Sequence, residues 1–423
     1  MKPFNNKLLL ILIFILFALA CEDKNENCDF YTGRGNLISY ELITEYTKET
    51  FEILIGVYGF DPSEFDIQND VKIYKVIYES LGAKGEPTQL SGAIYVPQLK
   101  TKKPLPTLKI SHYTITQRNA VASVSPNVSP QSVLGSMQGY FAIYSDGIGY
   151  GVSVTQASYV NKQASAISGI DLLRASKEFA CENGIELNDQ LFTTGYSAGG
   201  YGTMAFHQII EQEYSDEFTI TANSPGAGPY SLYDMATRIF EDDVYTTPYY
   251  LGFALWGYML ATGDNDALNR WVKPQYRNAI LTMYDGTYAG NQIDNALNDT
   301  MSVLLESKFI SDFLADGEVD FKKYLKENSF IFDGWKPNAP IHFMHGEKDN
   351  SFIYGGWRPK APIHFMHGEK DKTVFHFLMK LGADQLISNG SKGIKTTSYP
   401  GDHGGAAADC MINSIKWFNT MKQ

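Results

Sequence analysis

The stretch Leu191-Phe192-Thr193-Thr194-Gly195-Tyr196-Ser197-Ala198-Gly199 decides the fold of this chain. It opens with an apolar run typical of a buried strand, turns through glycines, and is followed by a segment with helical character. The turn fits the pattern G-x-S-x-G, in which a serine occupies a sharp bend between a strand and a helix. The bend is strained, and side chains at Gly195 or Gly199 would clash. We therefore predict an exposed hydroxyl of Ser197 at a helix N-terminus, where the N–H of Ala198 can stabilise an oxyanion.

Short apolar segments alternate with helical patterns on both sides of this turn, which predicts a parallel sheet. The expected strands are 105–112, 140–145, 191–196, 218–223 and 395–399, and the expected helices are 162–182, 200–211, 373–387 and the C-terminal segment. Upstream, residues 71–78 and 89–96 alternate as the two strands of an antiparallel hairpin would, and we expect this hairpin at a sheet edge.

The alternation stops between residues 227 and 327, which have helical character and are rich in Tyr, Trp, Leu and Met. We interpret this segment as a helical lid inserted over the active edge of the sheet. The predicted fold class is thus α/β, with a mostly parallel central sheet flanked by helices, built from residues 37–226 and 328–423.

A tandem duplication follows the lid. Residues 328–349 read NSFIFDGWKPNAPIHFMHGEKD, and residues 350–371 read NSFIYGGWRPKAPIHFMHGEKD, with 18 identical positions. Two copies make no solenoid, and we interpret them as one strand with its approach loop, duplicated in frame. Near-identical copies fit one strand position almost equally well, so our hypothesis is that two registers coexist. We predict that deletion of residues 328–349 leaves folding and activity intact or improved.

A serine nucleophile needs a base, and the usual chain order for this turn is serine, acid, histidine. Of the eight histidines, His376 lies within a predicted helix, whereas His403 lies in a glycine-rich loop after the last strand. We predict His403 as the base. The remaining six precede the turn, follow it in its helix, or belong to the duplicated strand: His112, His207, His342, His345, His364 and His367. The His-x-x-His pairs of that strand point to opposite faces, so no metal site is expected.

The duplication offers two carboxylates for the acid, Asp371 and Asp349. Only Asp371 is followed directly by a predicted helix, from Thr373. Asp371 lies 32 residues before His403, and this separation holds one helix and one strand without excess. We prefer Asp371 and keep Asp349 as the alternative. Asp402 is disfavoured because its carboxylate cannot easily reach the ring of the adjacent histidine.

The N-terminus has the order of a secretory signal over residues 1–21, and its apolar run, Leu8 to Leu19, is short for a membrane span. Cys21 at the cleavage point resembles the lipobox of bacterial lipoproteins, although Ala18 replaces the usual leucine. We expect an exported protein, lipid-anchored at Cys21 to the outer membrane or cell surface through a polar tether, residues 22–36. This anchor is the only membrane contact that we expect.

Charge and cysteine content narrow the partners. A net charge of −12 argues against nucleic acid, because phosphate binding needs a basic surface. After Cys21 the cysteines are Cys28, Cys181 and Cys410, which lack metal-ligand spacing and allow at most one disulfide among them.

Together these residues resemble the α/β-hydrolase superfamily, and within it the lid-bearing bacterial esterases similar to secretory lipases. The resemblance runs from about Val71 to the C-terminus and rests on Gly195–Gly199, the strand 361–371 with Val374 after it, and residues 401–404. Two shorter segments add to it. Asp146-Gly147-Ile148-Gly149 resembles the family's Asp-x-x-Gly-x-Gly loop, and Ala227-Gly228-Pro229-Tyr230 resembles the segment that opens the lid.

The family often has His-Gly after the early strand, where a backbone N–H gives the second oxyanion donor; here the residues are His112-Tyr113. Tyr113 retains the N–H but brings a side chain beside the reacting carbonyl. The resemblance implies a serine carboxylic-ester hydrolase with the triad Ser197, Asp371 and His403. It also implies an oxyanion hole at Ala198 and Tyr113. We expect a small-molecule ester as the substrate and no cofactor. The alternatives are a prolyl-oligopeptidase-type serine peptidase, against which the lack of a propeller-like N-terminal domain counts, and a non-catalytic hydrolase-fold surface protein.

Overall fold

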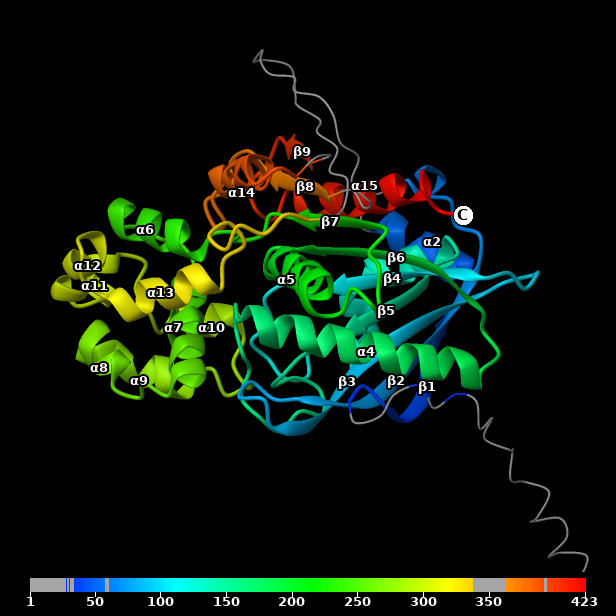
Figure 1. Ribbon diagram of the computed structural model, residues 1–423, viewed down its shortest axis with the longest axis horizontal. Helices are drawn as coiled ribbons and strands as arrows, with labels where there is room; N and C mark the ends of the chain where they lie inside the picture. The colour runs from blue at the N-terminus through cyan, green and yellow to red at the C-terminus, as the bar shows by residue number, and fades with distance from the viewer. Residues whose placement is uncertain (1–27, 29, 31–33, 58–60, 338–362, 392–393) are drawn as a thin grey trace, which may run out of the picture.

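One sheet runs through the computed structural model, which describes residues 28, 30, 34–57, 61–337, 363–391 and 394–423 (Figure 1). The described strands form a nine-stranded sheet in the order β1-β2-β3-β5-β4-β6-β7-β8-β9. The pairs from β1 to β5 along this order are antiparallel, and the remaining pairs are parallel, so the predicted mostly parallel sheet is confirmed. The bounds are β1 Leu37–Tyr46, β2 Asp70–Leu81, β3 Pro87–Gln98, β4 Leu105–Ser111, β5 Phe141–Ser145, β6 Leu187–Tyr196, β7 Ala222–Gly226, β8 Ile363–Gly368 and β9 Ile394–Tyr399.

Helices cover both faces of this sheet because strands buried on two sides need an apolar layer on each. On one face lie α4 (Lys162–Glu182), α5 (Ala198–Glu213) and α14 (Phe377–Ser388). On the other lie α2 (Lys48–Val57), α3 (Pro130–Met137) and α15 (Ala407–Asn419). In the described part of the chain, no helix is both long and apolar enough to span a bilayer.

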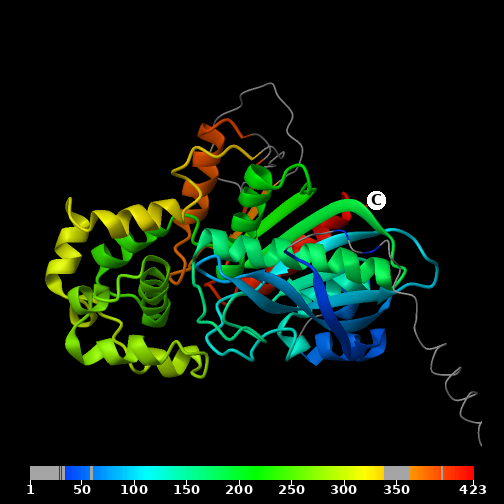
Figure 2. The ribbon, with the colours of Figure 1, turned by 60° about the horizontal axis from the view of Figure 1, so that its bottom comes forward.

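The inserted segment forms a separate group of helices at one end of the sheet, as both views show (Figures 1 and 2). Its own aromatic core includes Trp271, which stacks on Phe309 with ring centroids 5.0 Å apart. The lid helices are α6 Leu232–Asp242, α7 Pro248–Thr262, α8 Ala267–Trp271, α9 Pro274–Thr282, α10 Gly290–Asp294, α11 Met301–Leu304, α12 Ser307–Leu314 and α13 Val319–Glu327.

Three sequence predictions of element position were wrong. The hairpin β2–β3 is not at the sheet edge, because β1 pairs with the outer side of β2. The strand predicted at 218–223 is β7, Ala222–Gly226, and lies four residues later at its start. The helix predicted from Thr373 begins at Phe377, because residues 372–376 first form a turn around the carboxylate of Asp371.

The two copies of the duplication contribute different parts to the described structure. The start of the first copy, residues 328–337, packs on the domain: Trp335 is buried, and its Nε1 donates to Glu211 at 3.1 Å. The end of the second copy forms β8 between β7 and β9. Residues 338–362, with Asp349, His342 and His345, lie outside the described residues.

A disulfide and an ion pair attach the N-terminal segment to α4. Cys28 is bonded to Cys181, so the third cysteine, Cys410, is the buried free thiol. Nε of Arg34 lies 2.7 Å from Oδ1 of the buried Asp171. The signal and lipidation predictions, including Cys21, fall on residues 1–27, outside the described residues.

Candidate active site

Ser197 occupies a strained turn between β6 and α5, with φ 59° and ψ −123°. A Cβ atom on Gly195 would lie 2.4 Å from the carbonyl oxygen of Gly199, and one on Gly199 would lie 2.4 Å from that of Ser111. Both approaches are too close for a side chain, so only glycine fits at these positions. The bend is held by the N–H of Ser197, which donates to the carbonyl of Gly226 at 2.9 Å.

His403 lies between the serine and a carboxylate. Its Nε2 is 2.9 Å from Oγ of Ser197, and its Nδ1 is 2.5 Å from Oδ2 of Asp371. With the carboxylate as acceptor, Nδ1 carries the hydrogen, and Nε2 is left to accept from the serine hydroxyl. The loop that carries His403 joins β9 to α15, and its backbone is fixed by the hydroxyl of Tyr196, which donates to the carbonyl of His403 at 2.6 Å.

Asp371 follows β8 and is enclosed by donors. Its Oδ1 accepts from the N–H groups of Thr373 and Val374, each at 2.9 Å. Its Oδ2 lies 3.1 Å from Nε2 of His367 as well as close to His403. Burial alone would raise the pKa of this carboxyl, but the hydrogen bonds from the two histidines outweigh burial and lower the pKa to about 2. Asp371 is therefore an anion at neutral pH.

The structure brings together Ser197, Asp371 and His403 and leaves Asp402 aside. The carboxylate of Asp402 accepts instead from the N–H of Gly405 at 2.8 Å. His376, the other histidine considered as base, lies at the start of α14 with its Nε2 2.8 Å from the hydroxyl of Ser398. The contact from His367 was not anticipated, and the only signal in the sequence is its place four residues before Asp371.

The predicted oxyanion donors are the backbone N–H groups of Ala198 and Tyr113, which line the pocket wall near Ser197. In the described part of the chain, neither the N–H of Ala198 nor that of Tyr113 is paired with an acceptor. Both are thus available to a charged oxygen. The side chain of Tyr113 is 45% exposed and does not line the apolar pocket next to Ser197, so it does not narrow that pocket.

An apolar pocket opens from Ser197 under the lid. Its wall combines Pro229, from the segment that opens the lid, with Val374 after β8 and with residues of three lid helices. These lid residues are Leu232, Met235, Ala236, Ile239, Tyr250, Leu251, Ala254, Phe321 and Leu325. Such a wall suits an apolar group attached to the atom that reacts with the serine.

Asp146, in the segment that resembles the family's glycine loop, is buried and serves structure. Its carboxylate accepts from the hydroxyl of Ser91 at 2.5 Å and from the N–H of Ser123 at 3.2 Å. Burial raises its pKa. Gly149 has φ +88°, and a Cβ there would lie 2.3 Å from the backbone of Ala157. The loop is therefore packed tightly beside the site.

No protein-family model matches this sequence, and neither does any curated protein. Several solved structures do match in fold. The rice cell wall degrading esterase LipA from Xanthomonas oryzae aligns with a TM-score of 0.78 at 18% identity, over 93% of this chain and 100% of that chain. A Legionella pneumophila protein whose hydrolase assignment is provisional gives 0.77 at 21% identity, over 91% and 97%.

Candida antarctica lipase A in its closed state gives a TM-score of 0.64 at 16% identity, over 92% of this chain and 82% of that chain. At such identities the likeness concerns the fold. The nine-stranded sheet, its flanking helices and these likenesses show that this chain has the α/β-hydrolase fold.

Proposed function

We propose that this chain is a serine carboxylic-ester hydrolase. The observation that carries the proposal is the position of His403, 2.9 Å from Oγ of Ser197 and 2.5 Å from Oδ2 of Asp371. The esterases and lipases that share its fold support the same reaction class.

The reaction follows from the directions of these hydrogen bonds. The hydroxyl of Ser197 attacks the ester carbonyl while Nε2 of His403 takes its proton, and Asp371 stabilises the imidazolium that forms. The N–H groups of Ala198 and Tyr113 hold the oxyanion. His403 then returns the proton to the departing alcohol, which leaves an acyl group on Ser197. A water molecule, activated by His403, releases the acid and restores the serine.

The apolar pocket supports an ester with an acyl or aryl group of some length. A panel of nitrophenyl esters of rising chain length, run beside acetylated sugars and proline-containing peptides, tests this. We expect turnover of the nitrophenyl esters, with a preference for chains longer than acetyl. Cleavage of the peptides with no turnover of any ester would instead identify a prolyl-oligopeptidase-type peptidase.

A fluorophosphonate probe tests the nucleophile directly. We expect labelling of the wild type, none of Ser197→Ala, and a loss of about 10⁴-fold in kcat for Asp371→Asn, which leaves the imidazole without its anionic partner. The matched control is Asp402→Asn, whose carboxylate does not touch the ring, and its rate should stay near that of the wild type. An unlabelled wild type that is correctly folded would instead point to a non-catalytic surface protein.

We also propose that the chain is exported and held at the cell envelope by a lipid on Cys21, with no other membrane contact. The short apolar run from Leu8 to Leu19, followed by Cys21 at the cleavage point, supports this proposal. Growth with radiolabelled palmitate should label the wild type and leave Cys21→Ser unlabelled. Equal labelling of the two proteins would refute the anchor.

A further inference from the structure

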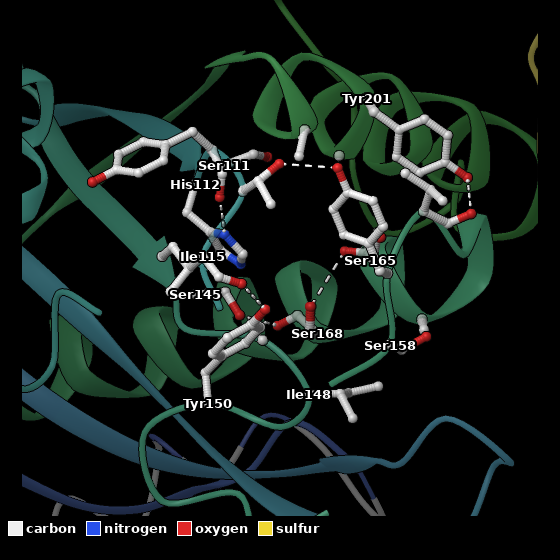
Figure 3. A pocket seen from close by; sticks show the side chains of 18 of the residues that line it. Ser111, His112, Ile115, Ser145, Ile148, Tyr150, Ser158, Ser165, Ser168 and Tyr201 are labelled. Atoms are coloured by element: carbon white, nitrogen blue, oxygen red, sulfur yellow. Dashed lines mark hydrogen bonds between the residues drawn. The ribbon is translucent and has the colours of Figure 1, made fainter. Parts of the chain in front are cut away.

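A second cavity adjoins the apolar pocket and differs from it in chemistry. The two share Tyr159, Val160 and Ala198 in their walls. The wall of the second cavity contains the buried Lys109. It also contains His112 and several hydroxyls, which Figure 3 shows around one space. The hydroxyl of Tyr159 lies 3.0 Å from that of Thr114, which ties the shared wall to the segment after β4.

Lys109 projects into this region from the middle of β4, with only 3% of its surface exposed. Its Nζ lies 4.8 Å from the centroid of the Phe206 ring and donates to the hydroxyl of Ser111. A Cβ on Gly169 of α4 would lie 3.0 Å from Cε of Lys109, so the helix makes room for the lysine stem. The site thus holds the stem closely and leaves the amino group beside the cavity.

This amino group lacks a negative partner. None of the ion pairs of the described residues includes Lys109, and none of the described residues that line the cavity is Asp or Glu. Burial lowers the pKa of Lys109 to about 7. A buried cation without a counter-charge is destabilising, and an anion within hydrogen-bond distance would relieve that cost.

His112 adds a second basic group to the same wall. Its Nδ1 is 2.7 Å from the carbonyl oxygen of Tyr113, so Nδ1 carries the hydrogen. Its Nε2 faces Gly147, another wall residue, where a Cβ would lie 3.3 Å away. Burial lowers the pKa of His112, and the charge of Lys109 lowers it further. Two basic groups therefore lie together with no Asp or Glu among the described residues of the cavity wall.

The hydroxyl of Ser111 is a second donor beside the amino group of Lys109. The hydroxyl of Ser111 accepts from Lys109 and keeps its own hydrogen to donate. Ser145 and Ser168 also line the cavity near His112 (Figure 3), but their hydrogens are donated within the protein, that of Ser168 to the carbonyl of Ser165 and that of Ser145 to the carbonyl of Ser168. An ammonium and a hydroxyl that converge on one space match the oxygens of a carboxylate, for which charge-assisted hydrogen bonds are short and strong.

We propose that this cavity binds a small carboxylate, held by the amino group of Lys109 and the hydroxyl of Ser111, with His112 beside it. The carboxylate comes either from a free small acid or from the far end of a substrate whose ester lies at Ser197, because the two cavities share a wall. In both cases the ligand chemistry is the same, and the experiment separates the sources.

The first arm measures thermal stabilisation of the full chain by acetate at constant ionic strength, with acetamide as the neutral isostere. We expect a concentration-dependent rise in Tm with acetate alone. Lys109→Met, which keeps the stem and removes the charge, should weaken acetate binding at least tenfold. The matched control is Lys395→Met, since Lys395 is also a buried strand lysine but lies on β9 away from this cavity.

The second arm compares kcat/KM for a nitrophenyl hemiester of a dicarboxylic acid with that for the neutral ester of equal length. A ratio that falls at least tenfold in Lys109→Met assigns the carboxylate to the substrate. An unchanged ratio with loss of acetate binding assigns it to a free acid.

The proposal is overturned if acetate and acetamide act alike on the wild type and the hemiester ratio does not change. If Lys109→Met fails to fold, Ser111→Ala and the wild-type comparison of acetate with acetamide still decide the matter. Acetate binding to Ser197→Ala is measured without turnover, so the carboxylate site and the ester hydrolase can fail separately.

Discussion

Nε2 of His367 lies 3.1 Å from Oδ2 of Asp371. This is the same oxygen that accepts from His403. The ring of His367 is fully buried, and its Nε2 also lies 2.7 Å from the carbonyl of Val374, which follows the acid in the chain. Nε2 therefore carries the hydrogen, which it shares between the carbonyl of Val374 and Oδ2 of Asp371. We assign His367 as a positioning residue for Asp371.

His367→Leu removes the donor and should lower kcat about tenfold to a hundredfold with KM unchanged, because a misplaced carboxylate misaligns His403. His367→Gln, which can still present an N–H near the former Nε2, should recover most of the loss. Equal activity of the Leu variant and the wild type would contradict the assignment.

The pH dependence of unfolding distinguishes loss of the His367–Asp371 contact from a simple packing defect. The pKa of Asp371 is lowered in the fold to about 2, so its contribution to stability is present above the unfolded value near 3.8 and is lost as pH falls through about 2. His367→Leu raises the folded pKa. Its free energy of unfolding should therefore drop less between pH 4 and pH 2 than that of the wild type.

The duplication allows a pair of matched deletions. Deleting residues 338–359 joins Pro337 to Lys360 and keeps every described contact of residues 328–337 and of β8. We expect wild-type folding and activity from this variant. Deleting 328–349 should also fold, but it places Gly355 where Asp333 now contacts Lys162 at 3.3 Å and Gln208 at 2.8 Å.

Asp333 also accepts from the N–H of Trp335 at 3.1 Å. The second deletion should thus be less stable than the first by about 1–2 kcal/mol, the usual value of two hydrogen bonds and a partly exposed ion pair. Urea unfolding of the two variants measures the difference. Loss of folding in both variants would show that residues 338–359 are needed, and would overturn the interpretation of the repeat as redundant.

A structural feature can be predicted from the sequence only where its geometry restricts which residue types can occupy it. The turn at Ser197 is predictable because a Cβ at Gly195 or Gly199 would lie 2.4 Å from a backbone carbonyl oxygen. Only glycine fits there, so the motif is visible in the sequence. His403 follows from chain order and elimination. The position of β7 could not be predicted: Ala-Asn-Ser-Pro-Gly favours a turn, and these residues form a strand because they pair with β6 on one side and β8 on the other.

Side-chain partners across the fold are the other limit. Lys109 sits in a run that predicts an ordinary strand, and nothing local tells that its amino group borders a cavity. The role of His367 depends on how the turn after β8 folds back to it. Which two of Cys28, Cys181 and Cys410 are bonded depends on where the N-terminal segment crosses α4. Each of these contacts joins residues that are far apart in the sequence or that share no recognisable motif.

The disulfide between Cys28 and Cys181 should contribute about 2–5 kcal/mol to stability, because it restricts a long loop of the unfolded chain. Cys181→Ser should lower the free energy of unfolding by that amount. Dithiothreitol should lower the Tm of the wild type and leave that of the variant unchanged. The protein denatured without reductant should show two fewer reactive thiols than the reduced protein, and equal counts would exclude the bond.

Lys109 should make stability depend on pH near neutrality. Burial lowers its folded pKa from 10.5 to about 7, so between these values the unfolded chain binds one proton more than the folded chain. The free energy of unfolding then rises with pH, by at most about 1.4 kcal/mol per unit for a single group. Below pH 7 both states carry the proton and the full cost of the buried charge remains.

Lys109→Met has no such titration. Its free energy of unfolding should therefore exceed that of the wild type most near pH 7, and the difference should shrink toward pH 9. Urea unfolding at pH 7, 8 and 9 in buffers free of carboxylates measures this. The exposed Lys380, replaced by Met, is the control and should give a curve parallel to the wild type. Adding acetate should keep Lys109 charged to higher pH and move the rise in stability upward, whereas parallel curves for all three proteins would show that Lys109 carries no charge cost.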